Sequence, residues 1–319
     1  MAISKNFAYQ FNPLTYKNLM KDIYPSLDSV LTSDHEYWLH FETPSKNLQQ
    51  QLQKRLSIPK SVRLILFAEE VRSRCIKIEG GYILIVHGVQ PSTMTGDEDF
   101  PTLRFWITNK GVLSISTGKI QAMHDIQSLL QDEPDPNSMT CFIHVIENII
   151  NSLEDSIYHL DENLNKIESN FEYTEEATLN IMSIRQDIIF IRRYIFPQKD
   201  ALINLSNKID FVSDSIRASL KELSEGMLRQ VEAIEMLRER AVIIQDNLTN
   251  QIGEIANRRM YLLTIIMLIF TPAFFIVGLF SMYLPIPGMN SRLTWWIVDI
   301  VILVVSYGLY KLFKVKNWL

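Results

Sequence analysis

The sequence predicts an α+β domain, a long helical stalk and a C-terminal two-helix transmembrane hairpin. Two observations predict the hairpin. No charged side chain occurs from Met260 to Ser291, and a second apolar run from Leu293 to Tyr310 is broken only by Asp299. Each run reaches the roughly 20 residues that a helix needs to cross about 30 Å of hydrocarbon. A third observation, the change from strand-like to helical hydrophobic spacing after Pro136, separates the domain from the stalk.

These observations divide the 319 residues into three parts. We expect a cytoplasmic α/β domain at 1–135, a long-helix bundle and stalk at 136–259, and the transmembrane hairpin at 260–319. Within the hairpin, the first span covers about 260–284 and the second about 293–313.

The first part has strand-like composition between His35 and Thr117. β-Branched and aromatic residues concentrate in five segments, with Gly80-Gly81 and Asn109-Lys110-Gly111 as hairpin turns. The segments predicted as strands are 37–42, 63–68, 74–89, 102–108 and 112–117. Amphipathic segments near Ser45 to Leu56 and Ile120 to Gln131 lie between or after them.

Long helices follow. Apolar residues recur at spacings of three and four from Phe142 onward, which predicts the first helix. A second covers about Glu175 to Tyr194, and Pro197 marks its end or a kink. A third begins near Asp214 and meets no proline before the membrane, so we expect it to continue into the first span.

Composition excludes several classes of function. The net charge is −5, and Lys and Arg are interleaved with Asp and Glu, so no basic face for nucleic acid is present. The sequence has no phosphate loop, nucleophile elbow or metalloprotease helix, so we expect neither an enzyme nor a resident cofactor. Without an apolar signal segment, the soluble body is expected in the cytoplasm.

Basic residues predict the topology. Arg258 and Arg259 precede the first span and Lys311, Lys314 and Lys316 follow the second, whereas the connection holds only Arg292. Because positive charge collects on the cytoplasmic side, both termini should be cytoplasmic in a multi-pass protein of the cell (inner) membrane.

Small, polar and sulfur-bearing residues gather on one face of the first span. Taken at alternating steps of three and four, this pore stripe consists of Asn257, Met260, Thr264, Met267, Thr271, Phe274, Gly278 and Ser281. Such a face has two interpretations. It is either a contact between helices, because small residues allow close approach, or the wall of a pore that presents hydroxyl and backbone dipoles to a hydrated cation. The second requires an oligomer with the first span innermost.

The sequence also resembles a known family. The run NRRMYLLTIIMLIFTPAFFIVGLF (257–280) is similar to the pore helix of the CorA superfamily of divalent metal-ion transporters, and its details are closest to the ZntB zinc-transport branch. Further segments resemble that branch in order: WLHFE from Trp38, VRSRCIKIEGGYILIVHGV from Val71, LRFWIT from Leu103, IRRYIFPQKDAL from Ile191, RERAVIIQDNL from Arg238, and the terminal WL.

The resemblance implies a homopentameric funnel of cytoplasmic domains, with the first spans around the axis and the second spans outside. It implies transport of divalent cations, with zinc ahead of magnesium or cobalt. A non-conducting membrane-anchored regulator is the alternative from another class. The lysines at 311, 314 and 316, interpreted above as topology anchors, would then also form a basic collar at the inner mouth.

The chain departs from the family at the outer mouth. The family's Gly-x-Asn signature follows the motif matched here by Gly278-Leu279-Phe280, but this chain has Ser281-Met282-Tyr283 at that place. A literal Gly288-Met289-Asn290 occurs seven residues later. Either Ser281 and Tyr283 rebuild the mouth, or Asn290 folds back to serve it.

Asp299 lies about one turn into the second span. An ionisable group at that depth is a candidate for function, here a proton relay. The alternative is a contact with the membrane interface or with Arg292. No His/Cys cluster occurs in the span, so we do not expect tight coordination of zinc.

Overall fold

The computed structural model describes residues 6–11, 17–18, 36–42, 58–68, 72–88, 100–118, 120, 123, 137–169, 175–281 and 292–315. The chain forms two compact units, Met1–Ile244 and Gln245–Leu319. The division into 1–135, 136–259 and 260–319 stays a prediction.

The first unit contains a seven-stranded mixed sheet in the order β2-β1-β3-β7-β6-β5-β4. Among the described strands, β3 and β7 pair in parallel and the other neighbours are antiparallel. The strands are β1 (Asn6–Phe11), β2 (Lys17–Asn18), β3 (Glu36–Glu42), β4 (Arg74–Ile78), β5 (Gly81–His87), β6 (Thr102–Ile107) and β7 (Gly111–Ser116). Four of the five predicted strand segments and both hairpin turns are confirmed, and β1 and β2 are additional.

The predicted strand at 63–68 is wrong, because this segment belongs to the helix α3 (Lys60–Leu66). Its apolar run suggested a strand, yet the buried residues Val62 and Leu66 are four apart and Leu64 is 68% exposed. That is the spacing of one helical face. Arg104 of β6 donates from Nη1 to the Leu66 carbonyl at 2.7 Å, so the sheet supplies a donor to the last turn of the helix.

Three long helices follow: α6 (Ser138–Ser169), α7 (Glu175–Lys208) and α8 (Asp214–Ser281). The second helix was predicted to cover about 175–194, with Pro197 as its end or a kink. It does not end there but continues through Pro197 to Lys208. Tertiary contacts explain the continuation. The Gln198 side-chain oxygen accepts from the backbone N–H of His87 at 3.0 Å, and the Tyr82 hydroxyl donates to the Lys208 carbonyl.

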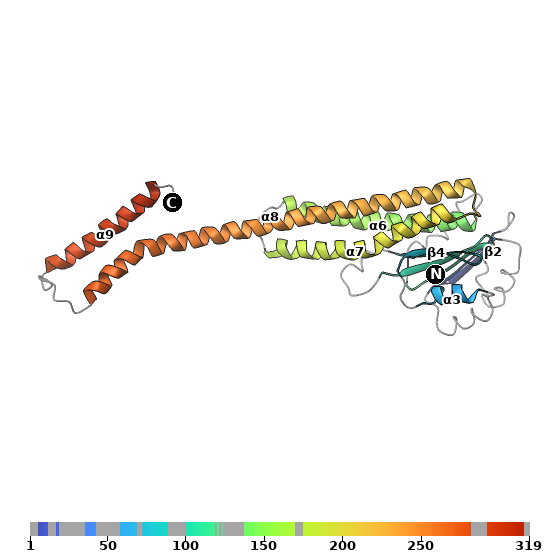
Figure 1. The fold of residues 1–319 in the computed structure, drawn as a ribbon, viewed down its shortest axis with the longest axis horizontal. Coiled ribbons are helices and arrows are strands. Elements are labelled where there is room, and N and C mark those ends of the chain that lie inside the picture. Colours follow the sequence, from blue (N-terminus) through green and yellow to red (C-terminus); the bar gives the residue numbers. More distant parts are fainter. Residues whose placement is uncertain are drawn as a thin grey trace. The chain divides into compact units, whose positions relative to one another are not determined.

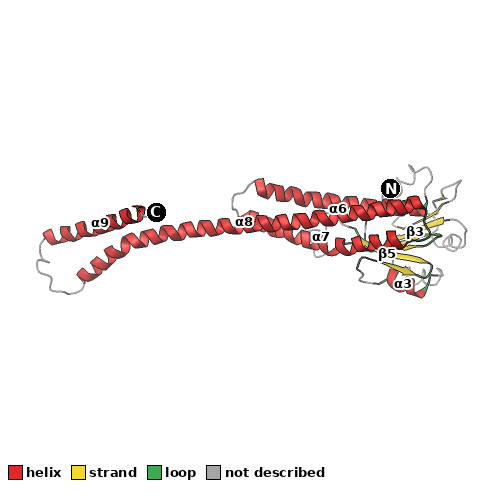
Figure 2. Cartoon of the chain, turned by 45° about the horizontal axis from the view of Figure 1, so that its top comes forward, coloured by secondary structure: helices red, strands yellow, loops and turns green. Residues whose placement is uncertain are grey.

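The core lies on both faces of the sheet. On one face, odd-numbered residues of β3, β5 and β7 pack with Val62 and Leu66 of α3. On the other, α6 contacts β3 and β7 while α7 contacts β4 and β5. Phe105 of β6 meets Phe142 of α6 edge-on with ring centroids 4.9 Å apart. Figures 1 and 2 show α3 on one side of the sheet and the long helices on the other.

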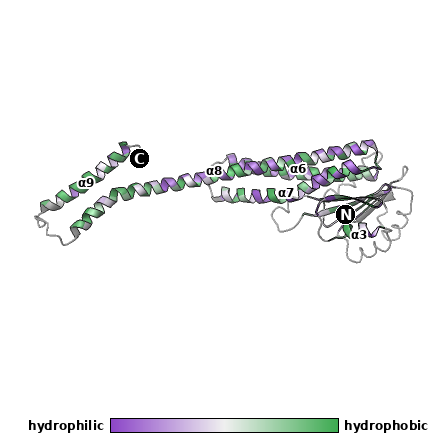
Figure 3. Ribbon diagram, in the orientation of Figure 1, coloured by the Kyte–Doolittle hydropathy of each residue, from purple (hydrophilic) through white to green (hydrophobic). Residues whose placement is uncertain are grey.

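The second unit holds the C-terminal part of α8 and the helix α9 (Arg292–Val315). Two helices in the described part of the chain are long and apolar enough to cross a membrane. The most apolar stretch of each helix is not buried within the chain. Figure 3 shows the hydrophobic character concentrated in α9 and the end of α8. The predicted span at about 293–313 lies within α9. The first span is helical to Ser281, and 282–291 lie outside the described residues.

Candidate functional site

The pore stripe lies on α8 and is not covered by the rest of the chain. Met260, Met267 and Phe274 are 67%, 59% and 72% exposed, and a Cβ atom added at Gly278 would meet nothing within 4 Å. The remaining described side chains of the stripe, those of Asn257, Thr264 and Thr271, are also exposed. The isolated chain therefore leaves a face of its first span open to contacts with something else.

The two threonines of the stripe donate inward to their own helix. Thr264 Oγ1 donates to the Met260 carbonyl at 2.8 Å and Thr271 Oγ1 to the Met267 carbonyl at 2.5 Å. These bonds use the hydroxyl hydrogens, so the oxygen lone pairs are what each threonine presents beyond the helix. A row of oxygen acceptors on an apolar helix suits weak interaction with a hydrated cation.

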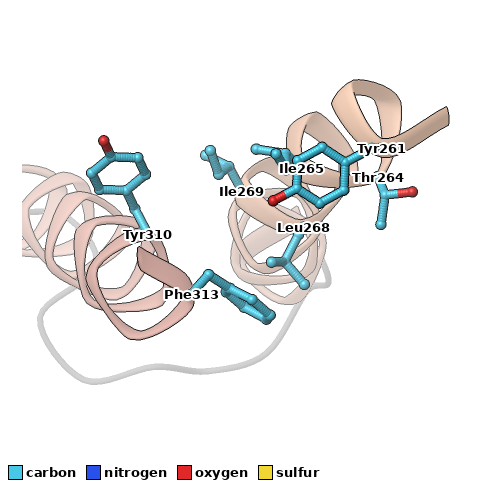
Figure 4. A pocket seen from close by; sticks show the side chains of 7 residues that line it. All are labelled: Tyr261, Thr264, Ile265, Leu268, Ile269, Tyr310 and Phe313. Atoms are coloured by element: carbon cyan, nitrogen blue, oxygen red, sulfur yellow. The ribbon is translucent and has the colours of Figure 1, made fainter. Parts of the chain in front are cut away.

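A second face of α8 approaches α9. Ser306 Oγ of α9 donates to the Ile269 carbonyl at 3.4 Å. An interhelical groove lies beside this contact, lined by Tyr261, Thr264, Ile265, Leu268, Ile269, Tyr310 and Phe313 (Figure 4). Of the stripe, only Thr264 also lines this groove. One face of α8 thus faces α9, and the stripe lies on a different face. Thr264 is the stripe residue that belongs to both.

The predicted charged residues of α9 are exposed. Asp299, Lys311 and Lys314 all project from the surface of the chain. Asp299 is seven residues before Ser306, and residues so spaced lie on nearly the same helix face. The proton-relay and collar roles stay predictions, and Lys316 lies outside the described residues.

The proposed outer mouth lies almost wholly outside the described residues. These are Met282, Tyr283, Gly288, Met289 and Asn290, while Ser281 is the last residue of α8. Which of the two triplets forms the mouth therefore stays open. Among the described residues, no group of three or more His, Cys, Asp or Glu is arranged to hold a metal ion.

Sequence reasoning missed the groove. Its aromatic residues Tyr261, Tyr310 and Phe313 lie in the terminal turns of the two spans, next to Arg258 and Lys314. The available signal was the pairing of aromatic and basic residues at one end of both apolar runs, which is typical of a membrane–water interface.

Comparison with known proteins identifies the family. The model of the CorA-like Mg2+ transporter protein family matches residues 33–314, which is most of the chain. The chain belongs to this family. The expected membership and the expected CorA-like fold are confirmed. As a CorA-like protein, the chain is a membrane protein that transports divalent metal cations and is not an enzyme.

Individual relatives of this CorA-like chain are distant but cover most of its length. The zinc transport protein ZntB of Yersinia enterocolitica is 24% identical over 298 residues, covering 92% of this chain and 91% of the relative. The complete CorA magnesium transporter of Methanocaldococcus jannaschii superposes with a TM-score of 0.83 at 19% identity, covering 100% of both chains. The ZntB cytoplasmic domain of Vibrio parahaemolyticus superposes with a TM-score of 0.65 at 18% identity, covering 79% of this chain and 100% of that domain.

Proposed function

We propose that this chain assembles as a homopentamer in the cell (inner) membrane and conducts zinc along a central path lined by the pore stripe. The observation that carries the proposal is the exposure of the described side chains of that stripe, on a face of α8 that the described part of the chain does not cover. One hairpin cannot enclose a path for an ion, so several copies must bring their stripes around a shared axis.

Zinc is the proposed cargo because relatives of this chain carry the name zinc transport protein. The segment from Pro285 to Thr294 also has no Asp or Glu. In the family that the sequence resembles, the magnesium branch commonly has an acidic residue soon after its Gly-x-Asn triplet. Magnesium and cobalt are the competing cargoes. Competition among zinc, magnesium, cobalt and nickel for uptake into liposomes holding the purified protein separates them.

Both termini are proposed to be cytoplasmic, because basic residues flank the two spans at that end. A divalent ion that crosses 100 mV inward gains about 4.6 kcal/mol. This free energy suffices for uptake through a neutral path without ATP. Asp299 is proposed as the candidate proton relay should uptake be coupled to protons.

A bulky substitution tests the path. Gly278→Trp should reduce zinc uptake into proteoliposomes at least tenfold, because an indole would fill the space left beside Gly278 in each subunit. The matched control is Val277→Trp, which adds the same ring at the same depth but about 100° around the helix. Size-exclusion chromatography confirms that both variants keep the oligomer.

Two outcomes would count against the proposal. Normal uptake by Gly278→Trp would remove Gly278 from the lining. Uptake by the wild-type protein no faster than by empty vesicles would favour the non-conducting regulator.

A further inference from the structure

The groove between α8 and α9 has the size and lining of a site for hydrocarbon. Its volume is about 440 Å³, within the roughly 300–1,000 Å³ of ordinary ligand pockets. Figure 4 shows the Phe313 ring extending from α9 toward α8 and the Tyr261 hydroxyl on the side of α8 that faces α9, with the Thr264 hydroxyl turned away from α9. Since that hydroxyl donates to the Met260 carbonyl, aliphatic and aromatic surface dominates the lining.

The groove lies at the end of the spans, not at mid-membrane. Tyr261 is the second residue of the charge-free run, and Tyr310 stands directly before Lys311. Tyrosine is enriched where hydrocarbon meets lipid headgroups. An occupant of the groove would therefore reach from the headgroup level into the acyl region.

Basic side chains border the same end of the groove. Arg258 is three residues before Tyr261 and seven before Ile265, so it shares their helix face. Lys314 follows Phe313 and is four residues after Tyr310. Both are exposed, as is Glu254, one turn before Arg258. Two cations against one anion leave this rim positive, and a basic pocket between membrane helices suits an anionic headgroup.

We propose that this groove binds an anionic phospholipid of the cytoplasmic leaflet, its acyl chain against Leu268 and Ile269 and its phosphate beside Arg258 and Lys314. The leaflet rests on the topology given under the proposed function. Charge complementarity at the rim favours a lipid over a helix of a neighbouring copy, because an apolar helix would leave the net positive charge of this rim uncompensated.

Lipid retention by the purified full-length assembly tests this site. Native mass spectrometry would count bound phosphatidylglycerol and phosphatidylcholine of identical acyl chains. The wild-type protein should prefer phosphatidylglycerol. Arg258→Gln and Lys314→Gln should each weaken that binding about fivefold, the change that corresponds to about 1 kcal/mol per basic residue. The matched control is Arg259→Gln, which removes the same charge about 100° away on α8.

A groove-filling variant tests the acyl part. Leu268→Trp should lower retention of both lipids while the oligomer stays intact. Equal retention of the two lipids by the wild-type protein would overturn the proposal, as would equal losses in Arg258→Gln and Arg259→Gln. Dissociation of the assembly by Leu268→Trp with unchanged lipid per subunit would also overturn it and assign the groove to a neighbouring copy.

The lipid measurement is independent of ion flux. Gly278→Trp should keep the preference for phosphatidylglycerol even when it conducts no zinc. A wild-type protein that binds phosphatidylglycerol at the groove but conducts no ion would contradict the proposed function alone. Normal zinc flux with no lipid preference would contradict this inference alone.

Discussion

Arg240 joins two helices of the first unit through a single side chain. Its guanidinium donates to both carboxylate oxygens of Glu168, with Nε to Oε1 at 2.9 Å, and also to Asp161 and Asn165. These acceptors lie on α6, whereas Arg240 lies on α8. The hydrogen bond from Arg240 lowers the pKa of the Glu168 carboxyl. A bidentate contact of this kind fixes how α6 and α8 are aligned along their length as well as the distance between them.

Replacing Arg240 should therefore reduce stability in a pH-dependent way. Because the pKa of Glu168 is lower in the folded state, its stabilising effect is full above the unfolded value near 4.3 and is lost as pH falls through the folded value. Both side chains are about a third exposed, so we expect Arg240→Gln to lower the free energy of unfolding by only about 1 kcal/mol at pH 7. Thermal unfolding followed by circular dichroism at pH 7 and at pH 3 checks this.

The matched control for Arg240 is Lys166→Gln, which breaks an exposed pair with Glu162 within α6. It should change the melting temperature little at either pH. A deficit of Arg240→Gln that is as large at pH 3 as at pH 7 would contradict the ionic account and leave only lost packing.

Among the elements, the β4–β5 hairpin depends on two adjacent glycines. Gly80 has φ +83°, a conformation that side chains disfavour. Gly81 has a different reason, because a Cβ atom there would lie 2.0 Å from the Ile107 carbonyl oxygen of β6. That oxygen is backbone, so only a displacement of the strand could make room.

Gly81→Ala should consequently weaken the β5–β6 pairing and cost about 1–3 kcal/mol, the usual effect of an overpacked site. The measurement is the shift in melting temperature of the full chain. Gly88→Ala is the control, because its Cβ would meet only the side chain of Ile120, at 3.4 Å or more. If the two variants were equally stable, the close approach of β6 to Gly81 would be refuted.

The helices and strands also show which parts of the fold local sequence patterns can predict. Period-two segments and the glycine turns predicted β3 to β7 because each pattern is local. The pattern at 63–68 misled because a short apolar run has the same composition in a strand and in a buried helix. A helix end at Pro197 was wrong because the contacts that hold α7 beyond it, from His87 and Tyr82, are remote in sequence. Local sequence patterns cannot predict such contacts.

On the scale of the whole molecule, composition predicted the membrane part most directly, since twenty apolar residues in a helix have few other destinations. The stripe could also be predicted from the sequence, because helical spacing alone places its members on one face of the helix. The groove was not, since it requires knowing which turns of α8 and α9 lie opposite each other. Seven residues from two helices form it, and neither helix alone marks it as a site.

The driving force for transport is likewise a property of the assembled molecule. The first span carries no charged side chain from Met260 to Ser281, so nothing in it offsets the charge of a crossing ion. We expect zinc uptake to follow the membrane potential, because 100 mV contributes about 4.6 kcal/mol to a divalent ion. In proteoliposomes, a potassium diffusion potential set by valinomycin, negative inside, should accelerate uptake at equal internal and external pH. Empty vesicles under the same potential are the control. If the uptake rate does not depend on the membrane potential but uptake stops when a pH gradient is dissipated, transport must be electroneutral and coupled to protons. Asp299→Asn would then be the first variant to test.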